Sequence, residues 1–195
     1  MQLKDAVTTV MSTVALLFSA YSLYESSLRR PQLSVHVAPR IDYTDPDRPT
    51  AVREVFVLPL TLANDGARGA TVLGINLEVT NPRTKQSKIF YAARLGSWGE
   101  TPLKPFAPVV LSGKAIYSQA LQFEPRPGET VPTILDQTGG DYTFKLTLDN
   151  TATGEGGAPL QFEMRIGELD YRNFQGTGTM AMWAPSFRPP TNAGR

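Results

Sequence analysis

The sequence contains no cysteine and a single histidine, His36. The lack of cysteine excludes disulfide bridges, thiolate metal sites and cysteine nucleophiles, and one histidine cannot form a multi-histidine metal cage. A strong excess of positive or negative charge is also lacking, because the sequence has 19 Lys and Arg residues and 18 Asp and Glu residues. Nucleic-acid binders usually carry a strong basic excess. These absences predict a protein that is not an enzyme, uses no cofactor or metal, and binds no nucleic acid.

The 195 residues suffice for one domain of ordinary size. Gly and Pro, 16 of each, indicate many turns without the periodicity of collagen. We predict three regions: a transmembrane anchor helix over residues 1–30, a β-sandwich domain over 31–171, and an irregular aromatic and Pro-rich tail over 172–195.

The first region contains nineteen uncharged residues, from Ala6 to Tyr24. As a helix they cover about 28 Å, close to the roughly 30 Å hydrocarbon core of a bilayer. A cleaved signal peptide, with Ala20 and Ser22 before the cut, and a buried core helix remain alternatives. The predicted anchor residues are the apolar ones and two tyrosines at headgroup level: Val7, Val10, Val14, Leu16, Leu17, Phe18, Tyr21 and Tyr24.

Small and hydroxyl-bearing residues make this span only marginally apolar. The strongly apolar residues favour insertion by roughly 2–4 kcal/mol, and six hydroxyl residues oppose it. A face of small residues lets a second helix approach closely, although small residues are also common in short anchors. The predicted helix-packing face consists of Thr8, Ser12, Ala15, Ser19 and Ser22.

The basic residues predict the orientation. Lys4 precedes the span and is offset by Asp5, whereas Arg29, Arg30 and Arg40 follow it. By the positive-inside rule, we expect a single-pass protein of the bacterial inner (cytoplasmic) membrane whose soluble domain faces the cytoplasm, with the periplasm as the alternative.

The rest of the chain alternates apolar and polar residues with the period of a β-strand. Pro31 should end the helix, no further helix is expected, and Pro59 predicts an edge, a bulge or an outward position. We therefore predict a mainly β protein with a seven-stranded immunoglobulin-like antiparallel β-sandwich. Its strands should cover residues 32–38, 54–64, 70–80, 87–93, 109–123 with a break at 112–113, 141–150 and 159–166.

Three large aromatic residues, Trp98, Trp183 and Phe187, lie in Pro- and Gly-rich surroundings. Aromatic residues are common anchors of interfaces, so we predict that they contact a partner. The alternatives are that Trp98 closes one end of the sandwich and that the tail folds back on it.

Other polar groups give weaker signals. Asp42, Asp45 and Asp47 share a loop but lack the spacing of a calcium loop. The Gly-rich stretches at 154–157 and 176–179 lack the Gly-Lys-Ser/Thr sequence of a phosphate-binding loop. Neither pattern predicts a site.

The order of several segments resembles a known group of proteins. These segments are Ser22–Glu25, Leu28–Val35, Val57–Leu62, Asn64–Arg68, Leu77–Pro82 and Phe90–Tyr91. Together they are similar to small bacterial membrane-anchored Ig-like β-sandwich proteins of unassigned function. The resemblance covers residues 1–93 and implies an architecture but no activity.

The sequence thus predicts a non-enzymatic, single-span membrane-anchored accessory or scaffolding subunit. Its expected partners are the lipid bilayer and a larger integral membrane protein complex, reached through the helix, the sandwich and the tail. The alternative is a tethered module that binds or senses a ligand or peptide through an open sheet edge.

Overall fold

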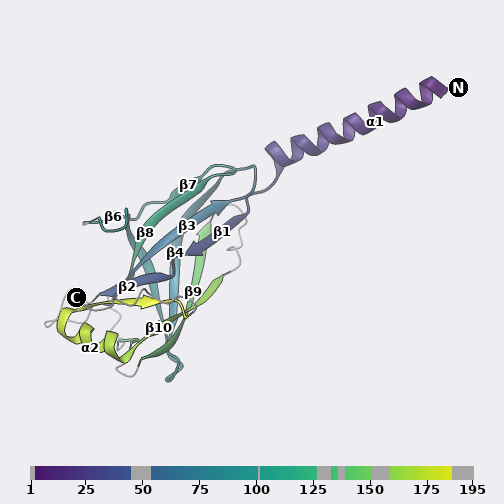
Figure 1. The fold of residues 1–195 in the computed structure, drawn as a ribbon. Coiled ribbons are helices and arrows are strands. Elements are labelled where there is room, and N and C mark those ends of the chain that lie inside the picture. The colour runs from purple at the N-terminus through teal and green to yellow at the C-terminus, as the bar shows by residue number, and fades with distance from the viewer. Residues whose placement is uncertain are drawn as a thin grey trace, which may run out of the picture.

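The computed structural model describes residues 3–44, 54–100, 102–126, 133–135, 139–150 and 159–185. A long helix projects from one end of a β-sheet body, and a short helix lies at the opposite end (Figure 1). In chain order the elements are α1 (Leu3–Leu23), the π-helical turn η1 (Tyr24–Leu28), β1 (Leu33–Val37), β2 (Arg40–Thr44), β3 (Val55–Asn64), β4 (Ala70–Thr80), β5 (Ser87–Gly96), β6 (Lys104–Pro105), β7 (Val109–Leu111), β8 (Ile116–Pro125), β9 (Gly140–Asn150), β10 (Leu160–Ile166), α2 (Glu168–Thr177) and β11 (Thr179–Trp183).

The long strands bury every second side chain, as the alternation predicts. In β3, Phe56, Leu58, Leu60 and Leu62 are buried, and the residues between them are partly exposed. All seven predicted segments form strands, with ends that differ by a few residues. The predicted break at 112–113 separates β7 from β8.

The strands form one closed barrel instead of two facing sheets. Eight antiparallel strands follow one another in the order β4, β5, β8, β3, β2, β11, β10, β9. The ring closes at β4, which pairs with β5 on one side and with β9 on the other. The prediction of an immunoglobulin-like sandwich is therefore wrong, and so is the resemblance to Ig-like sandwich proteins. Alternation shows that one face of each strand is buried, but it does not show which strands pair with each other. The pairing distinguishes a sandwich of two sheets from a single barrel.

Three further strands lie outside the ring, because β1 pairs with β3, β6 with β5 and β7 with β4. β1 and β2 pair in turn with the same edge of β3. Val37 and Asp42 are five residues apart, whereas their partners in β3, Leu60 and Val57, are only three residues apart. The ladder therefore bulges between β1 and β2. Pro59 lies opposite this bulge: its carbonyl accepts the Ala38 N–H at 3.1 Å, but it has no N–H to donate in return.

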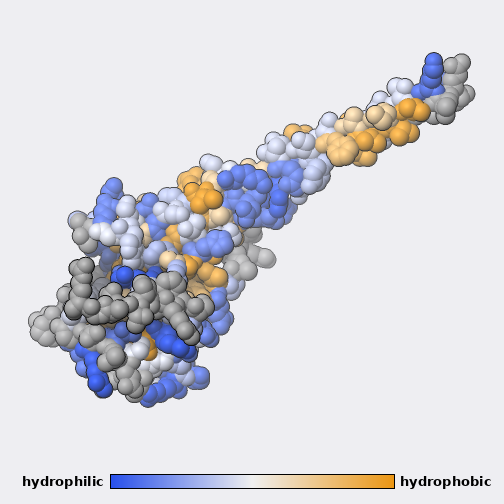
Figure 2. Space-filling model, in the orientation of Figure 1, coloured by the Kyte–Doolittle hydropathy of each residue, from blue (hydrophilic) through white to orange (hydrophobic). Residues whose placement is uncertain are grey.

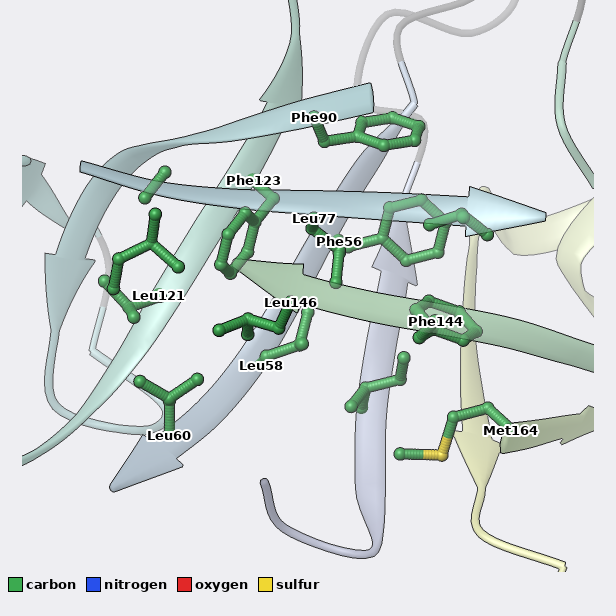
Figure 3. Close-up of a cluster of buried hydrophobic side chains, with 14 of the residues drawn as sticks. Phe56, Leu58, Leu60, Leu77, Phe90, Leu121, Phe123, Phe144, Leu146 and Met164 are labelled. Atoms are coloured by element: carbon green, nitrogen blue, oxygen red, sulfur yellow. The ribbon is translucent and has the colours of Figure 1, made fainter. Parts of the chain in front are cut away.

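Side chains fill the interior of the barrel. Phe56 packs edge-to-face on Phe90 and on Phe144, with ring centroids 4.9 and 5.6 Å apart (Figure 3). This geometry is the favoured one for aromatic pairs, and an eight-stranded barrel is just wide enough for such a core. The outer surface and the two ends are therefore the places available for function.

Two elements near the C-terminus were not expected from the sequence. α2 begins after Gly167, whose N–H donates to the Asp170 carboxylate at 3.1 Å, and ends at Gly178 in the left-handed region. Its Phe174 is buried in the core. β11 then lies between β2 and β10 and completes the ring. The segment 172–195, predicted to be irregular, thus contains the end of α2 and all of β11, and the expectation of no helix beyond the anchor is wrong.

A buried ion pair links the residue before β3 to β5. Lys88 and Glu54 are 5% and 1% exposed, and the Lys88 Nζ lies 2.8 Å from a carboxylate oxygen of Glu54. The other oxygen accepts the Ile134 N–H at 2.7 Å and the Tyr43 hydroxyl at 3.2 Å. Both charges are thus partnered, which burial requires.

Candidate membrane anchor and partner-binding surface

The N-terminal helix stands clear of the barrel, and apolar residues run along it (Figure 2). The segment Val7–Leu28 is long and apolar enough to cross a membrane, and none of it is buried. A core helix would bury an apolar stripe, so the core-helix alternative is excluded, whereas a membrane anchor and a signal sequence both fit. All eight predicted anchor residues are exposed: Val7, Val10, Val14, Leu16, Leu17, Phe18, Tyr21 and Tyr24.

The predicted helix-packing residues Thr8, Ser12, Ala15, Ser19 and Ser22 are all exposed. The Thr8 hydroxyl donates to the Lys4 carbonyl at 2.9 Å, and the Ser19 hydroxyl donates to the Ala15 carbonyl at 2.8 Å. Both hydroxyl protons are hydrogen-bonded within the helix, so contact with lipid leaves neither of them without an acceptor. Within the described chain, no such bond is formed by Ser12 or Ser22, whose hydroxyls remain available to a neighbouring helix.

The helix does not end at Pro31 as expected. α-helical geometry stops at Leu23, and the π-helical turn that follows is closed by the Arg29 N–H, which donates to the Tyr24 carbonyl at 2.8 Å. The Arg29 guanidinium then donates to Glu25 at 2.9 Å and to Gln32 at 2.6 Å. These contacts hold the residues between helix and barrel in one arrangement.

Asn64 ties this segment to the barrel. Its side-chain oxygen accepts the Gln32 and Gly66 N–H groups at 3.1 and 3.0 Å. Its amide nitrogen donates to the carbonyls of Arg68 and Ser112 at 2.8 and 3.0 Å. Asn64 is almost wholly buried, so its side chain depends on these four partners for its hydrogen bonds. We call residues 29–32, 64–68 and 112–115 the junction.

Two glycines permit the close packing of the junction. A Cβ atom at Gly66 would overlap the Arg30 carbonyl oxygen, and one at Gly113 would overlap that of Ala67. Since these neighbours are backbone atoms, no side-chain movement relieves the clash. The three turns of the junction are therefore in direct backbone contact.

On the outer surface of the barrel, the rings of Trp98 and Trp183 both lie beside the Arg40 guanidinium. The guanidinium carbon of Arg40 lies 6.0 Å from the Trp98 ring centroid and 5.5 Å from that of Trp183, which is cation–π distance. Asp42 accepts a hydrogen bond from the same guanidinium at 3.0 Å. We call these four residues the tryptophan–arginine cluster. Trp98 is 45% exposed, and exposed Trp beside Arg is typical of interface hot spots.

Trp98 also borders two hollows. One, of about 440 Å³, lies over β1, β3 and β8 and includes His36 and Thr61 in its lining. The other, of about 340 Å³, lies over β2, β3, β8 and residues 97–100 and 102–103. In that segment the Ser97 N–H donates to Glu100 at 2.9 Å, which holds the pKa of Glu100 below its usual range. Hollows beside an exposed Trp can receive side chains of a partner.

Some sequence-predicted positions lie elsewhere. Phe187 lies outside the described residues, as do Asp45 and Asp47. Asp42 lies in strand β2 instead of a loop, and its carboxylate pairs with Arg40. Among the described residues, no group of three or more His, Asp or Glu side chains is arranged to hold a metal ion.

Sequence reasoning missed the roles of Arg40 and Asn64. The sequence shows Arg40 only as a charge, because its position opposite Trp183 arises from the pairing of β2 with β11. Asn64 opens an Asn-Asp-Gly turn, a signal that locates the turn but not its contacts with Gln32 and Ser112.

The fold and the exposed helix define a helix-bearing antiparallel β-barrel protein. Neither a family model nor a curated protein matches this sequence. Among solved structures, it is similar to a Bordetella pertussis protein provisionally named ApaA, with 17% identity, a TM-score of 0.37, and coverage of 82% of this chain and 98% of that one. It is also similar to the structural genomics target SoR45, with 13% identity, a TM-score of 0.35, and coverage of 84% and 95%. Both TM-scores are below 0.5, so neither likeness assigns a family or a function.

Proposed function

We propose that this protein is a non-enzymatic, single-span accessory subunit of the bacterial inner membrane that docks on a larger integral membrane protein complex. The observation that carries the proposal is α1, an apolar helix exposed on all sides and joined to the barrel through the junction. The junction holds the residues that follow the helix against the barrel. Such a fixed link serves a retained anchor, whereas a cleaved leader does not need one.

The dimensions and charges of the segment support retention in the bilayer. The 21 residues of α1 cover about 30 Å, which matches the hydrocarbon core. Arg29 and Arg30 follow the span, while Lys4 before it is offset by Asp5. This distribution favours a barrel on the cytoplasmic side.

Two surfaces support docking on a partner. The small-residue face of α1 leaves room for close approach of another helix, with the Ser12 and Ser22 hydroxyls available to bond across the contact. The tryptophan–arginine cluster offers an aromatic surface on the barrel. A partner that spans the membrane and also has a domain on the barrel side engages both surfaces.

Two alanines in α1 give a matched test. Ala15 belongs to the small-residue face, and Ala20 lies about 140° away around the helix; both are exposed. Ala15→Leu and Ala20→Leu add the same apolar volume, so both variants should stay in the membrane. After extraction in mild detergent, we expect stoichiometric membrane partners with wild type and Ala20→Leu, and their loss with Ala15→Leu. Recovery of wild type as a lone monomer contradicts the proposal.

A second candidate function, binding of an extended peptide, is favoured by the gap between β1 and β10. Among the described residues, β1 pairs only with β3, and β10 meets β11 only at Arg165. The hollow between β1 and β10 measures about 370 Å³ and is lined by Val35, Val37, Leu160 and Phe162. β1 and β10 run in the same direction, so one inserted strand can pair antiparallel with both.

Amide exchange tests this second function. A peptide with valine at alternate positions should slow exchange of the outer amides of β1 and β10 and leave that of β4 unchanged. Unchanged exchange in β1 and β10 at saturating peptide contradicts it.

A further inference from the structure

Two large apolar side chains are unusually exposed at one end of the barrel. Val110 in β7 and Ile116 in β8 are each 73% exposed, more than any of the large apolar residues described in the anchor. They flank the turn at residues 112–115, which is closed by the Ala115 N–H donating to the Ser112 carbonyl at 3.3 Å. Large exposed apolar side chains on both sides of one turn are candidates for a contact surface.

This turn lies at the end of the barrel from which α1 leaves. The Lys114 N–H donates to the Gly66 carbonyl at 3.0 Å, and the Ala67 N–H donates to the Arg29 carbonyl at 3.1 Å. The exposed side chains are thus linked through two backbone contacts to the last residues of the helical segment. Figure 2 shows apolar and polar atoms side by side where helix and barrel meet.

The same end carries an excess of positive charge. Arg30, Arg68 and Lys114 are exposed, and the Lys114 ammonium donates to the backbone carbonyl of Asp65 at 2.7 Å. Asp65 is the one exposed acidic residue of the junction. Glu25, which precedes the junction in the sequence, is already paired with Arg29. Three cations against one carboxylate leave this surface complementary to anionic headgroups.

We propose that this end of the barrel rests on the bilayer and binds anionic lipid headgroups through Arg30, Arg68 and Lys114, while Val110 and Ile116 reach into the interfacial layer. The inference rests on the proposed retention of α1, because the anchor brings this end to the membrane surface. Basic residues beside a membrane-spanning helix favour anionic lipid, and apolar side chains between them add buried area. The barrel is thereby held in one orientation on the membrane.

The absence of native cysteine makes single-site labelling clean. Ile116→Cys and the control Ile89→Cys each receive an environment-sensitive dye in the full-length chain. Ile89 is also an exposed isoleucine, but its neighbour Phe90 pairs with Pro125, nine residues along β8 from Ile116. That separation is roughly 30 Å. The two proteins are reconstituted in vesicles of phosphatidylcholine and phosphatidylglycerol that contain a headgroup-attached quencher.

We expect the dye at position 116 to be quenched and blue-shifted, and the dye at position 89 to remain bright. Changing Arg68 and Lys114 to Gln should lower the contact equilibrium about fivefold per residue, and pure phosphatidylcholine or high salt should weaken it similarly. Equal quenching at 116 and 89 overturns the proposal. Quenching that is the same in pure phosphatidylcholine overturns the headgroup contact.

Flotation of the same vesicles at alkaline pH separates this proposal from the proposed function. Protein that fails to float shows that α1 does not anchor, and the proposed function fails. Protein that floats, with position 116 as bright as position 89, shows that the anchor holds and that the surface contact alone is wrong.

Discussion

Replacing Lys88 by methionine should destabilise the barrel strongly, because it leaves the Glu54 carboxylate in the core without its counter-charge. Glu54 is 1% exposed, and the Lys88 ammonium lies 2.8 Å away. The hydrogen bonds from Ile134 and Tyr43 remain in the variant, but they do not neutralise the charge. Loss of one partner of a buried pair costs about 3–5 kcal/mol. We expect a loss of that size in the free energy of unfolding.

The double variant Glu54→Gln/Lys88→Met separates charge from packing. The glutamine oxygen can still accept the Ile134 N–H, and no charge remains buried. Replacing both members of a buried ion pair is often close to neutral, so the double variant should recover at least about 2 kcal/mol relative to Lys88→Met.

Urea unfolding of the full chain in detergent, followed by tryptophan fluorescence, gives the three free energies. A Lys88→Met variant within about 1 kcal/mol of wild type would show that the buried Glu54 carboxylate does not need its counter-charge. A double variant as unstable as the single one also contradicts the prediction, because the cost then lies in packing and not in the unpaired charge.

The remaining predictions concern the junction and one surface pair. Asn64→Ala removes four hydrogen bonds and should lower the free energy of unfolding in urea by about 2–4 kcal/mol, since each bond contributes about 1 kcal/mol; an unchanged midpoint contradicts the role of Asn64. Gly113→Val should speed amide exchange in the junction, because its Cβ has no space beside the Ala67 carbonyl, and protection equal to wild type argues against this packing. Hydrogen bonds from Arg165 hold the pKa of Asp141 below its usual range. A lowered folded pKa contributes stability above the ordinary Asp pKa of about 3.9, and this is lost as the pH falls through the folded value. Arg165→Gln should therefore raise the Asp141 midpoint in an NMR titration and weaken the acid dependence of stability, and an unmoved midpoint contradicts the pairing.

The sequence predicts the strands well where alternation is long. From Phe56 to Leu62 in β3, every second residue is buried, which gives four buried positions. The break at Ser112-Gly113 is recognisable because both residues are common in turns. The apolar N-terminal helix is equally visible, because nineteen consecutive uncharged residues match the length of a membrane-spanning helix. These features depend only on neighbours along the chain.

Barrel closure is not visible in the sequence, because it depends on the shortest elements. β2 contributes only Ile41 and Tyr43 to the core, within a segment rich in charge and proline. β11 contributes only Met180 and Met182. Alternation over two apolar residues does not stand out from a loop, yet these strands join β3 to β10 and turn an open sheet into a ring.

The candidate sites divide in the same way. Trp98 and Trp183 can be selected singly as large aromatic residues in irregular surroundings. Their meeting at Arg40 follows from the register of β2 against β11, which pairs Arg40 with Trp183, and from the course of the segment after β5. Tertiary pairing of this kind leaves no local signal.

In the proposed function, α1 stays in the membrane as part of the mature protein. Native membranes washed with alkaline carbonate, followed by intact-mass measurement of this polypeptide, test it directly. We expect the washed membrane pellet to contain a polypeptide whose mass still includes α1. A shortened chain without α1 in the supernatant would contradict it.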